Sequence, residues 1–481
     1  MKKLLSCSKL ISLVSVIFIL LVCNFNLYAQ QNQIKTSLNE KGTDENQLKK
    51  IDGIIKKEIL SQIDESISKM RQSKTGKSSL KSGMGLAAIS ENDSTVLVTL
   101  YNETDGPNWT NKTNWLSGEP IRTWFGITVE GDNITEIRLK ENNLTGTIPE
   151  ELGQLTSLEF LSLDTNNLSG NIPATLGNLT SLDYLYLSGN QLTGGIPSEL
   201  GNLNNLLLLY LAGNQLSESI PVSLSNLASL RWFDLEKNKL TGNIPVELEQ
   251  LSLLEYLDLS NNRLSGSLPV ELSGLNALRW MVISNNQLSG TIPIELGGMA
   301  NLEMLYLNGN LLTGNLPVEL NNISNLRWLN LGQNQLTDSL PAGFSNLSKL
   351  ELIYLNENLF TGSVPSELGS VPSLRWLNLG SNQFSGSVPA EIWQPNFSLL
   401  YLDDNQLTGT LPSALGSMTN IEWLNLNSNL FTGSLPSEIS QLNRLKIMKV
   451  DSTRLDEMPD IIAPDSITDL TVFGNKFTFD D

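Results

Sequence analysis

The sequence predicts an α/β repeat solenoid, a protein in which one short structural unit is stacked many times along the chain. Two periodicities carry this prediction. Asparagine recurs from Asn142 to Asn429 at intervals of 24 residues, with a single interval of 23. Thirteen prolines, from Pro149 to Pro436, keep a constant distance from these asparagines. A fixed period of about 20–50 residues is the signature of stacked repeats, which bury a core only between neighbouring units.

Each unit contains a short strand followed by a tight turn. One copy reads Leu158-x-x-Leu161-x-Leu163-x-x-Asn166-x-Leu168-x-Gly170-x-Ile172-Pro173. The alternating leucines predict a strand with its apolar side inward, so that every unit adds one strand to a parallel sheet. The asparagine amide suits a buried turn, where it bonds backbone groups of adjacent coils. Glycine permits the turn, and proline fixes the chain where no ladder hydrogen bond is needed.

This unit resembles the plant-type leucine-rich repeat of plant receptor ectodomains, polygalacturonase-inhibiting proteins and secreted bacterial proteins. The resemblance covers about 340 residues. It implies a curved, right-handed superhelix with a parallel sheet on the concave side and turns and 3-10 segments on the convex side. Two features of plant members are missing, because the caps contain no cysteine pairs and no membrane span or kinase follows. The plant receptor role is therefore not carried over.

The first 29 residues predict an export signal. Lys2 and Lys3 precede an apolar run over 10–22, and Ala29 ends a small-residue cleavage site. Cys23 is a poor lipoprotein cysteine because Val22 precedes it, so a lipid anchor is not expected. We expect a protein that is secreted or held at the surface of a bacterial cell, without a transmembrane span.

Two segments separate this signal from the repeats. Residues 30–90 predict a polar tether with one amphipathic helix at about 45–71, where apolar residues recur every three or four positions, and a flexible linker over 72–90. Residues 91–134 predict an N-terminal cap, with a short helix over 95–101 that Asp93 or Ser94 caps. Its tryptophans, Trp109, Trp115 and Trp124, are expected to cover the first open face of the array. The array of 14–15 units then fills 135–481, with its last units degenerate.

Composition excludes several classes of function. There is no histidine, and the two cysteines, Cys7 and Cys23, both fall in the signal. This excludes Cys/His zinc sites, cysteine nucleophiles and Ser-His triads, and we expect no enzyme, no cofactor and no metal. Residues 91–481 carry 17 basic and 43 acidic residues, which argues against nucleic acid as a partner.

The candidate site is the concave side of the sheet. Five of the nine tryptophans and seven of the nine tyrosines fall at strand positions between the leucines, which we expect to face solvent. Just before the strands, arginine and glutamate alternate from Arg231 to Arg375, so the period in the middle is 48 residues. The predicted ligand-binding residues are Tyr184, Tyr186, Tyr210, Arg231, Trp232, Tyr256, Arg279, Trp280, Tyr306, Arg327, Trp328, Tyr354, Arg375, Trp376, Tyr401 and Trp423.

Tryptophan, tyrosine and arginine dominate binding hot spots, so this surface predicts recognition of an extracellular protein or peptide. A ladder in which aromatic side chains stack and charges pair only with each other is the competing interpretation. A glycan-binding adhesin or wall-associated protein is the alternative function, because aromatic side chains also stack on sugar rings. A column of Ser and Thr from Thr145 to Ser265 leaves ice binding as a remote alternative.

Overall fold

The computed structural model describes residues 47–59, 61–63, 65, 69, 89–458 and 466–477. The predicted export signal and Cys23 lie outside these residues, as does nearly all of the predicted 72–90 linker. The chain divides into two units, Met1–Leu86 and Ala87–Asp481. In the first unit, residues 47–59, 61–63, 65 and 69 are helical, which agrees with the helix expected at 45–71. No helix among the described residues is long and apolar enough to span a membrane.

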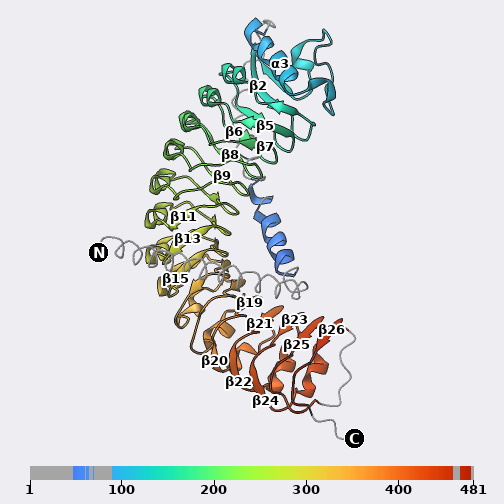
Figure 1. Cartoon of the computed structure of the whole chain (residues 1–481), viewed down its shortest axis with the longest axis vertical. Coiled ribbons are helices and arrows are strands. Elements are labelled where there is room, and N and C mark those ends of the chain that lie inside the picture. Colours follow the sequence, from blue (N-terminus) through green and yellow to red (C-terminus); the bar gives the residue numbers. More distant parts are fainter. Residues whose placement is uncertain are drawn as a thin grey trace, which may run out of the picture. The chain divides into compact units, whose positions relative to one another are not determined.

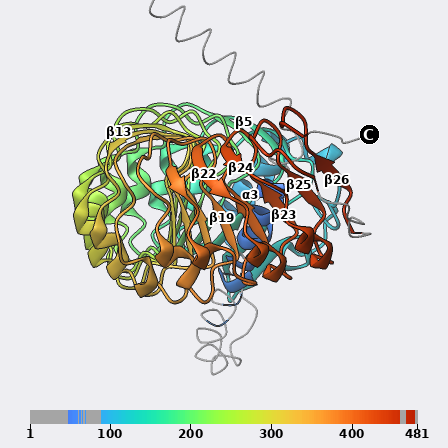
Figure 2. The ribbon, with the colours of Figure 1, turned by 90° about the horizontal axis from the view of Figure 1, so that it is seen from below.

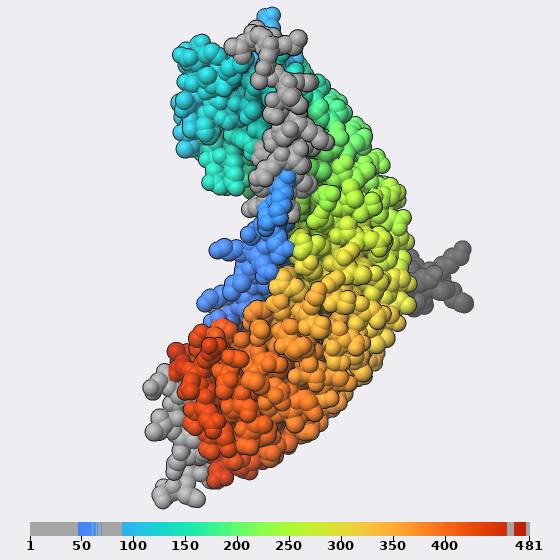
Figure 3. All heavy atoms as spheres, turned by 180° about the vertical axis from the view of Figure 1, so that it is seen from behind, coloured from blue at the N-terminus to red at the C-terminus, as the bar shows by residue number. Residues whose placement is uncertain are grey.

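The second unit is a curved solenoid with its strands on the inner side and its 3-10 segments on the outer side (Figure 1). Seen from below, the 3-10 segments follow the outer rim (Figure 2). In the space-filling view the colours succeed one another along the array, because each coil packs on the coil before and after it (Figure 3). This arrangement confirms the predicted leucine-rich repeat superhelix.

One sheet of sixteen strands runs through the described part of this unit, with its strands in chain order. The fifteen strands from β2 to β26 correspond to the 14–15 expected units, and the structure adds β1 before them. The strands are β1 (Ile127–Glu130), β2 (Asn133–Arg138), β4 (Phe160–Ser162), β6 (Tyr184–Tyr186), β8 (Leu208–Tyr210), β9 (Trp232–Asp234), β10 (Tyr256–Asp258), β12 (Trp280–Val282), β14 (Met304–Tyr306), β16 (Trp328–Asn330), β18 (Leu352–Tyr354), β19 (Trp376–Asn378), β21 (Leu399–Tyr401), β23 (Trp423–Asn425), β25 (Ile447–Lys449) and β26 (Asp469–Thr471).

Short flanking strands form three smaller parallel sheets. They are β3 (Thr145–Thr147), β5 (Asn167–Asn171) and β7 (Gln191–Thr193), then β11 (Ser265–Ser267), β13 (Gln287–Gly290), β15 (Leu311–Gly314) and β17 (Gln335–Leu336), then β20 (Ser385–Ser387), β22 (Gln406–Thr410) and β24 (Leu430–Thr432).

The convex side consists of 3-10 segments that begin directly after the repeated prolines, whose φ near −63° suits entry into a helical turn. They are η3 (Glu150–Gln154), η4 (Ala174–Asn178), η5 (Ser198–Asn202), η6 (Val222–Asn226), η7 (Val246–Gln250), η8 (Val270–Gly274), η9 (Ile294–Gly298), η10 (Val318–Asn322), η11 (Phe344–Asn346), η12 (Ser366–Ser370), η13 (Ala390–Ile392), η14 (Ser413–Ser417) and η15 (Ser437–Gln441). Of these, η11 begins three residues after its proline.

The N-terminal cap contains α3 (Glu91–Glu103), η1 (Gly106–Asn108) and η2 (Ile121–Thr123). The helix starts earlier than the expected 95–101. Its N-cap residue is Ser90, and not Asp93 or Ser94, because the Ser90 side chain accepts a hydrogen bond from the Asp93 N–H. Trp109, Trp115 and Trp124 are buried, and their rings contact one another, edge to face between Trp109 and Trp115 and tilted between Trp115 and Trp124. Strand β1 pairs with β2 in the only antiparallel pair among the described strands, so the cap covers the first edge of the sheet.

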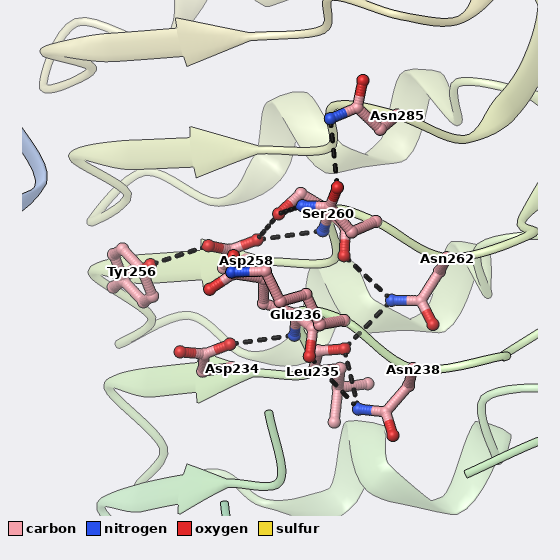
Figure 4. A network of polar contacts seen from close by, with 11 residues as sticks. Asp234, Leu235, Glu236, Asn238, Tyr256, Asp258, Ser260, Asn262 and Asn285 are labelled. Atoms are coloured by element: carbon pink, nitrogen blue, oxygen red, sulfur yellow. Dashed lines mark hydrogen bonds and ion pairs between the residues drawn. The ribbon is translucent and has the colours of Figure 1, made fainter. Parts of the chain in front are cut away.

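Buried asparagines hold the coils together, as the sequence predicts. The Asn262 side-chain amide donates to the carbonyl oxygens of Leu235, Leu259 and Ser260 at 2.9–3.2 Å, and its Oδ1 accepts the Leu240 N–H at 3.0 Å. The same pattern repeats around Asn238 (Figure 4). Each asparagine therefore links its own coil to the preceding one.

Candidate functional site: the concave face

The strands place the predicted site residues on one face of the sheet. In the three-residue strands of the long sheet from β4 to β25, the middle residue, such as Phe233 or Leu257, belongs to the hydrophobic core, whereas the residues before and after it do not. Because side chains alternate along a strand, those flanking residues lie on the opposite side, which we call the concave face. The register aligns Trp232, Tyr256, Trp280, Met304 and Trp328 as direct neighbours on five successive strands.

All the predicted aromatic residues belong to this face. Tyr184 and Tyr186 lie on β6, Tyr210 on β8, Trp232 on β9, Tyr256 on β10, Trp280 on β12, Tyr306 on β14, Trp328 on β16, Tyr354 on β18, Trp376 on β19, Tyr401 on β21 and Trp423 on β23. The four arginines, Arg231, Arg279, Arg327 and Arg375, directly precede strands β9, β12, β16 and β19. All sixteen predicted residues therefore lie in rows that run across neighbouring strands of the long sheet.

Their exposure differs from the expectation that they face solvent. Trp232, Trp280 and Trp328 are each only 1% exposed, whereas Trp376 and Trp423 are half-buried. Tyr186 and Tyr210 are also half-buried, and the remaining tyrosines are buried. Part of this burial comes from the ladder itself, because strands about 4.8 Å apart press large side chains against their neighbours. The rings of Tyr186 and Tyr210, for example, lie 5.4 Å apart at the centroids, edge to face.

The charged column is paired in the centre of the array. Arg279 contacts Glu303 at 2.7 Å and Arg327 contacts Glu351 at 2.9 Å, each across one repeat, and Arg231 contacts Glu255 in the same way. The guanidinium groups of Arg279 and Arg327 also stand 4.0 Å above the centroids of the adjacent Trp280 and Trp328 rings. The alternation of arginine and glutamate in the sequence therefore corresponds to ion pairs, and two of these also place an arginine over a tryptophan ring.

Three tryptophans carry an unpaired donor. The indole Nε1 atoms of Trp232, Trp280 and Trp328 are buried and have no hydrogen-bond partner among the described residues. Buried donors are nearly always paired, so such a group calls for an explanation. This row is partly visible in the sequence, because tryptophan recurs there every 48 residues.

An acidic network adjoins the aromatic column on β9 and β10 (Figure 4). Asp258 accepts from the Tyr256 hydroxyl at 2.9 Å and from the Ser260 hydroxyl at 2.6 Å, and Asp234 accepts the Glu236 N–H at 2.9 Å. Burial, followed by the charge of Asp258, raises the pKa of Tyr256 well above its ordinary value of 10.0, so this phenol stays protonated and donates.

The same acids are close enough to be considered as metal ligands. Carboxylate oxygens of Asp234, Glu236 and Asp258 lie within 4.8 Å of one another. Each of these carboxylates already has a protein partner, since Glu236 also contacts Lys237 at 2.9 Å. The network therefore orders the strand ends, and its chemistry does not require a cation.

The Ser and Thr column read from the sequence lies outside the concave face, and several of its members, such as Thr145, Ser169 and Thr193, belong to the flanking strands. Ser169 donates to the Gly146 carbonyl of the preceding coil at 3.2 Å, and Thr313, at the same position further along the array, donates to the Gly290 carbonyl at 3.3 Å. Ser289 repeats the same bond to Gly266. These hydroxyls serve the stacking of the coils.

Fold and concave face together define a solenoid whose sheet presents a periodic surface of aromatic and charged side chains. Family models agree with this class. The family model of a leucine-rich repeat region matches residues 208–402, and a second leucine-rich repeat model matches residues 132–192. A third model, of the leucine-rich repeat, matches residues 396–418 and 420–442. The chain belongs to the leucine-rich repeat family.

Solved structures give the same result. The chain is 33% identical to the Leptospira interrogans leucine-rich repeat protein LIC12759, over 71% of this chain and 85% of that one, with a TM-score of 0.60. It is 31% identical to the plant peptide hormone receptor RGFR1, solved in complex with RGF2, over 70% of this chain, with a TM-score of 0.66. Only 58% of that receptor chain is covered. A plant ice-binding protein matches at 29% identity over 58% of this chain and 90% of that one, with a TM-score of 0.51.

Proposed function

We propose that this protein is a secreted or cell-surface binding protein, without enzymatic activity, that recognises a protein or peptide on its concave face. The observation that carries the proposal is the concentration of tryptophan, tyrosine and arginine on one face of the sheet. These residue types dominate binding hot spots because they combine large apolar area with polar ends. The predicted export signal supports the location.

The peptide class fits the chemistry of the face. An extended polypeptide carries a carbonyl acceptor at every residue, which suits the exposed guanidinium of Arg375, and apolar side chains that suit the half-buried rings of Trp376 and Trp423. RGFR1, a structural relative, is a peptide hormone receptor. This likeness supports a peptide as the class of ligand.

The half-buried residues at the C-terminal end of the face are the best place to test this proposal. Trp376 and Trp423 can be truncated without opening the core, because neither belongs to it. We would present residues 30–481 to surface proteins and glycans of the native environment and compare wild type with the double variant Trp376→Ala/Trp423→Ala. A protein partner held by wild type and lost by the variant, at an unchanged melting temperature, is the expected result.

Two other outcomes contradict the proposal. A partner that binds both forms equally well would place recognition outside the concave face. Hits confined to glycans would favour the adhesin alternative, because aromatic side chains stack on sugars as well as on peptides. Ice binding is tested separately by thermal hysteresis, and the bonding of the Ser and Thr hydroxyls to the preceding coil argues for a structural role there.

A further inference from the structure

A stripe of exposed apolar residues runs along the convex side, away from the concave face. The first residue of five successive 3-10 segments, η6 to η10, is valine or isoleucine. The members of this convex stripe are Val222, Val246, Val270, Ile294 and Val318, exposed by 51%, 45%, 40%, 55% and 53% respectively. No other run of adjacent coils in the described chain exposes large apolar side chains in this way.

The local fold does not require these residues. The same turn, entered from the same proline, begins with Glu150 in η3, Ala174 in η4 and Ser198 in η5. Beyond the stripe, serine opens η12, η14 and η15. Valine and isoleucine are poor helix formers, and a half-exposed position gains little from burial. The stripe therefore has a cause other than the stability of its own turns.

The stripe borders a groove. A surface depression of about 810 Å³ lies between the central turns and is lined by Val246, Val270 and Ile294 together with the buried Leu268 and Ile292. Contiguous apolar surface on a soluble protein marks an interaction site. Because the five coils succeed one another about 4.8 Å apart at the sheet and the convex side is the longer one, the stripe spans at least about 19 Å.

An acidic row accompanies the stripe. Four of its members are followed directly by glutamate, namely Glu247, Glu271, Glu295 and Glu319. None of these four has an ion pair or a side-chain hydrogen bond among the described residues. Glutamate at this place also occurs in coils without the stripe, such as Glu199 and Glu367, where it complements the first turn. The combination of apolar stripe and acidic row is confined to the middle of the array.

We propose that the convex stripe docks a basic amphipathic segment of a partner protein, with apolar residues on the stripe and Lys or Arg over the acidic row. A second copy of this chain fits poorly, because residues 91–481 carry 43 acidic against 17 basic residues and two such surfaces repel. A lipid surface fits poorly for the same reason, since anionic headgroups attract basic segments. An α-helix of about 13 residues covers about 19 Å at 1.5 Å per residue.

The test uses designed peptides as probes. A labelled helical peptide with leucine on one face and lysine elsewhere is titrated with residues 30–481, and fluorescence anisotropy reports binding. A leucine–glutamate peptide of the same pattern and a serine–lysine peptide of the same charge are the matched probes. We expect only the leucine–lysine peptide to bind well, with weaker binding as salt is raised.

Three variants locate the binding. Val246→Ser/Val270→Ser/Ile294→Ser introduces the residue found at Ser366 and Ser413 in other coils, so the fold is retained, and we expect at least about tenfold weaker binding, or about 1.4 kcal/mol. Glu247→Gln/Glu271→Gln/Glu295→Gln should weaken binding and flatten its salt dependence. Trp376→Ala/Trp423→Ala on the concave face should leave it unchanged.

Several results overturn this inference. The first is failure of the leucine–lysine peptide to bind wild type. The second is that the serine triple variant binds this peptide as tightly as wild type does. The third is that the serine–lysine peptide binds wild type as tightly as the leucine–lysine peptide does. Loss of binding in the tryptophan variant would place the peptide on the concave face, which contradicts the convex site and leaves the proposed function standing. Conversely, if the pull-down finds no ligand for the concave face, the outcome of this peptide assay is unaffected.

Discussion

The concave face differs between its centre, from β9 to β18, and its C-terminal part, from β19 to β23. In the centre each arginine pairs with a glutamate one repeat on, and Arg279 and Arg327 also cover a tryptophan ring. Arg375 and Trp376 repeat the same dipeptide, but the residue in the next glutamate position is Ser398. Arg375 is exposed and has no ion pair or ring contact among the described residues, and Trp376 is half-buried.

The difference has a simple origin in the sequence. The coil between β19 and β21 is the one with 23 residues, and its 3-10 segment η13 has three residues where most have five. The strands nevertheless stay in register, with Trp376 opposite Leu399, because the convex turn takes up the deletion. The arginine of an Arg-Trp pair is therefore engaged in an ion pair where a glutamate follows one repeat on, whereas Arg375, which lacks that glutamate, stays exposed.

The largest loss of stability is expected from replacing a buried asparagine, and the loss should be the same in both regions. Asn262→Leu in the centre and Asn405→Leu in the C-terminal part each remove three donated bonds and one accepted bond. Because buried backbone groups lose their partners, each change should lower the free energy of unfolding by about 2–4 kcal/mol. Chemical denaturation measures both. A loss of stability in only one of the two variants would show that the coils themselves, and not only the concave face, differ between the centre and the C-terminal part.

A smaller effect is expected from the internal polar contacts of the centre. Tyr256→Phe removes the bond to Asp258 and should cost about 1 kcal/mol at neutral pH. The folded-state pKa of Tyr256 lies above the unfolded value, so its stabilisation is complete below pH 10.0 and is lost as the pH rises through the folded pKa. Wild type should therefore lose stability above pH 10.0 more steeply than the variant. Parallel profiles in thermal melts from pH 8 to 11 would contradict this.

The sequence was sufficient for the scaffold because each coil obeys the same spacing. Leucine alternation placed the strands, and the recurring asparagine predicted bonds such as those of Asn262. The Arg–Glu pairs of the centre match the competing interpretation, in which charges pair with each other, since residues 24 apart in a parallel stack are neighbours. Strand β1 was missed because it pairs antiparallel and lies outside the period.

The face was harder to predict than the scaffold. Trp232 and Trp280 are almost fully buried, and the spacing of the repeats alone does not reveal how exposed a strand residue is. The isolation of Arg375 was readable in principle, from the 23-residue interval and Ser398. The convex stripe was also readable, as valine or isoleucine after five successive prolines, but its exposure required the structure.

Removing the two arginines separately sharpens the comparison. Arg327→Ala breaks the contact with Glu351 and uncovers Trp328, so it should lower the free energy of unfolding by about 0.5–1 kcal/mol. Arg375→Ala removes no such contact and should leave stability within about 0.5 kcal/mol of wild type. In the pull-down of the proposed concave-face ligand, the order should reverse, with the larger loss for Arg375→Ala. Equal effects of the two variants on both readouts would remove the distinction.

The smallest effect on stability, and the most direct test, comes from restoring the missing partner. Ser398→Glu places a carboxylate where Glu303 and Glu351 stand in the centre, so Arg375 gains an ion pair one repeat on. A half-exposed pair of this kind should add only about 0–1 kcal/mol to the free energy of unfolding. Binding of the concave-face ligand should fall, because Arg375 is now engaged within the ladder. Ser398→Gln, which has the same length and no charge, is the matched control and should bind as wild type does. If Ser398→Glu and Ser398→Gln bind alike, the free charge of Arg375 has no part in recognition, and the C-terminal part of the face differs from the centre only in its packing.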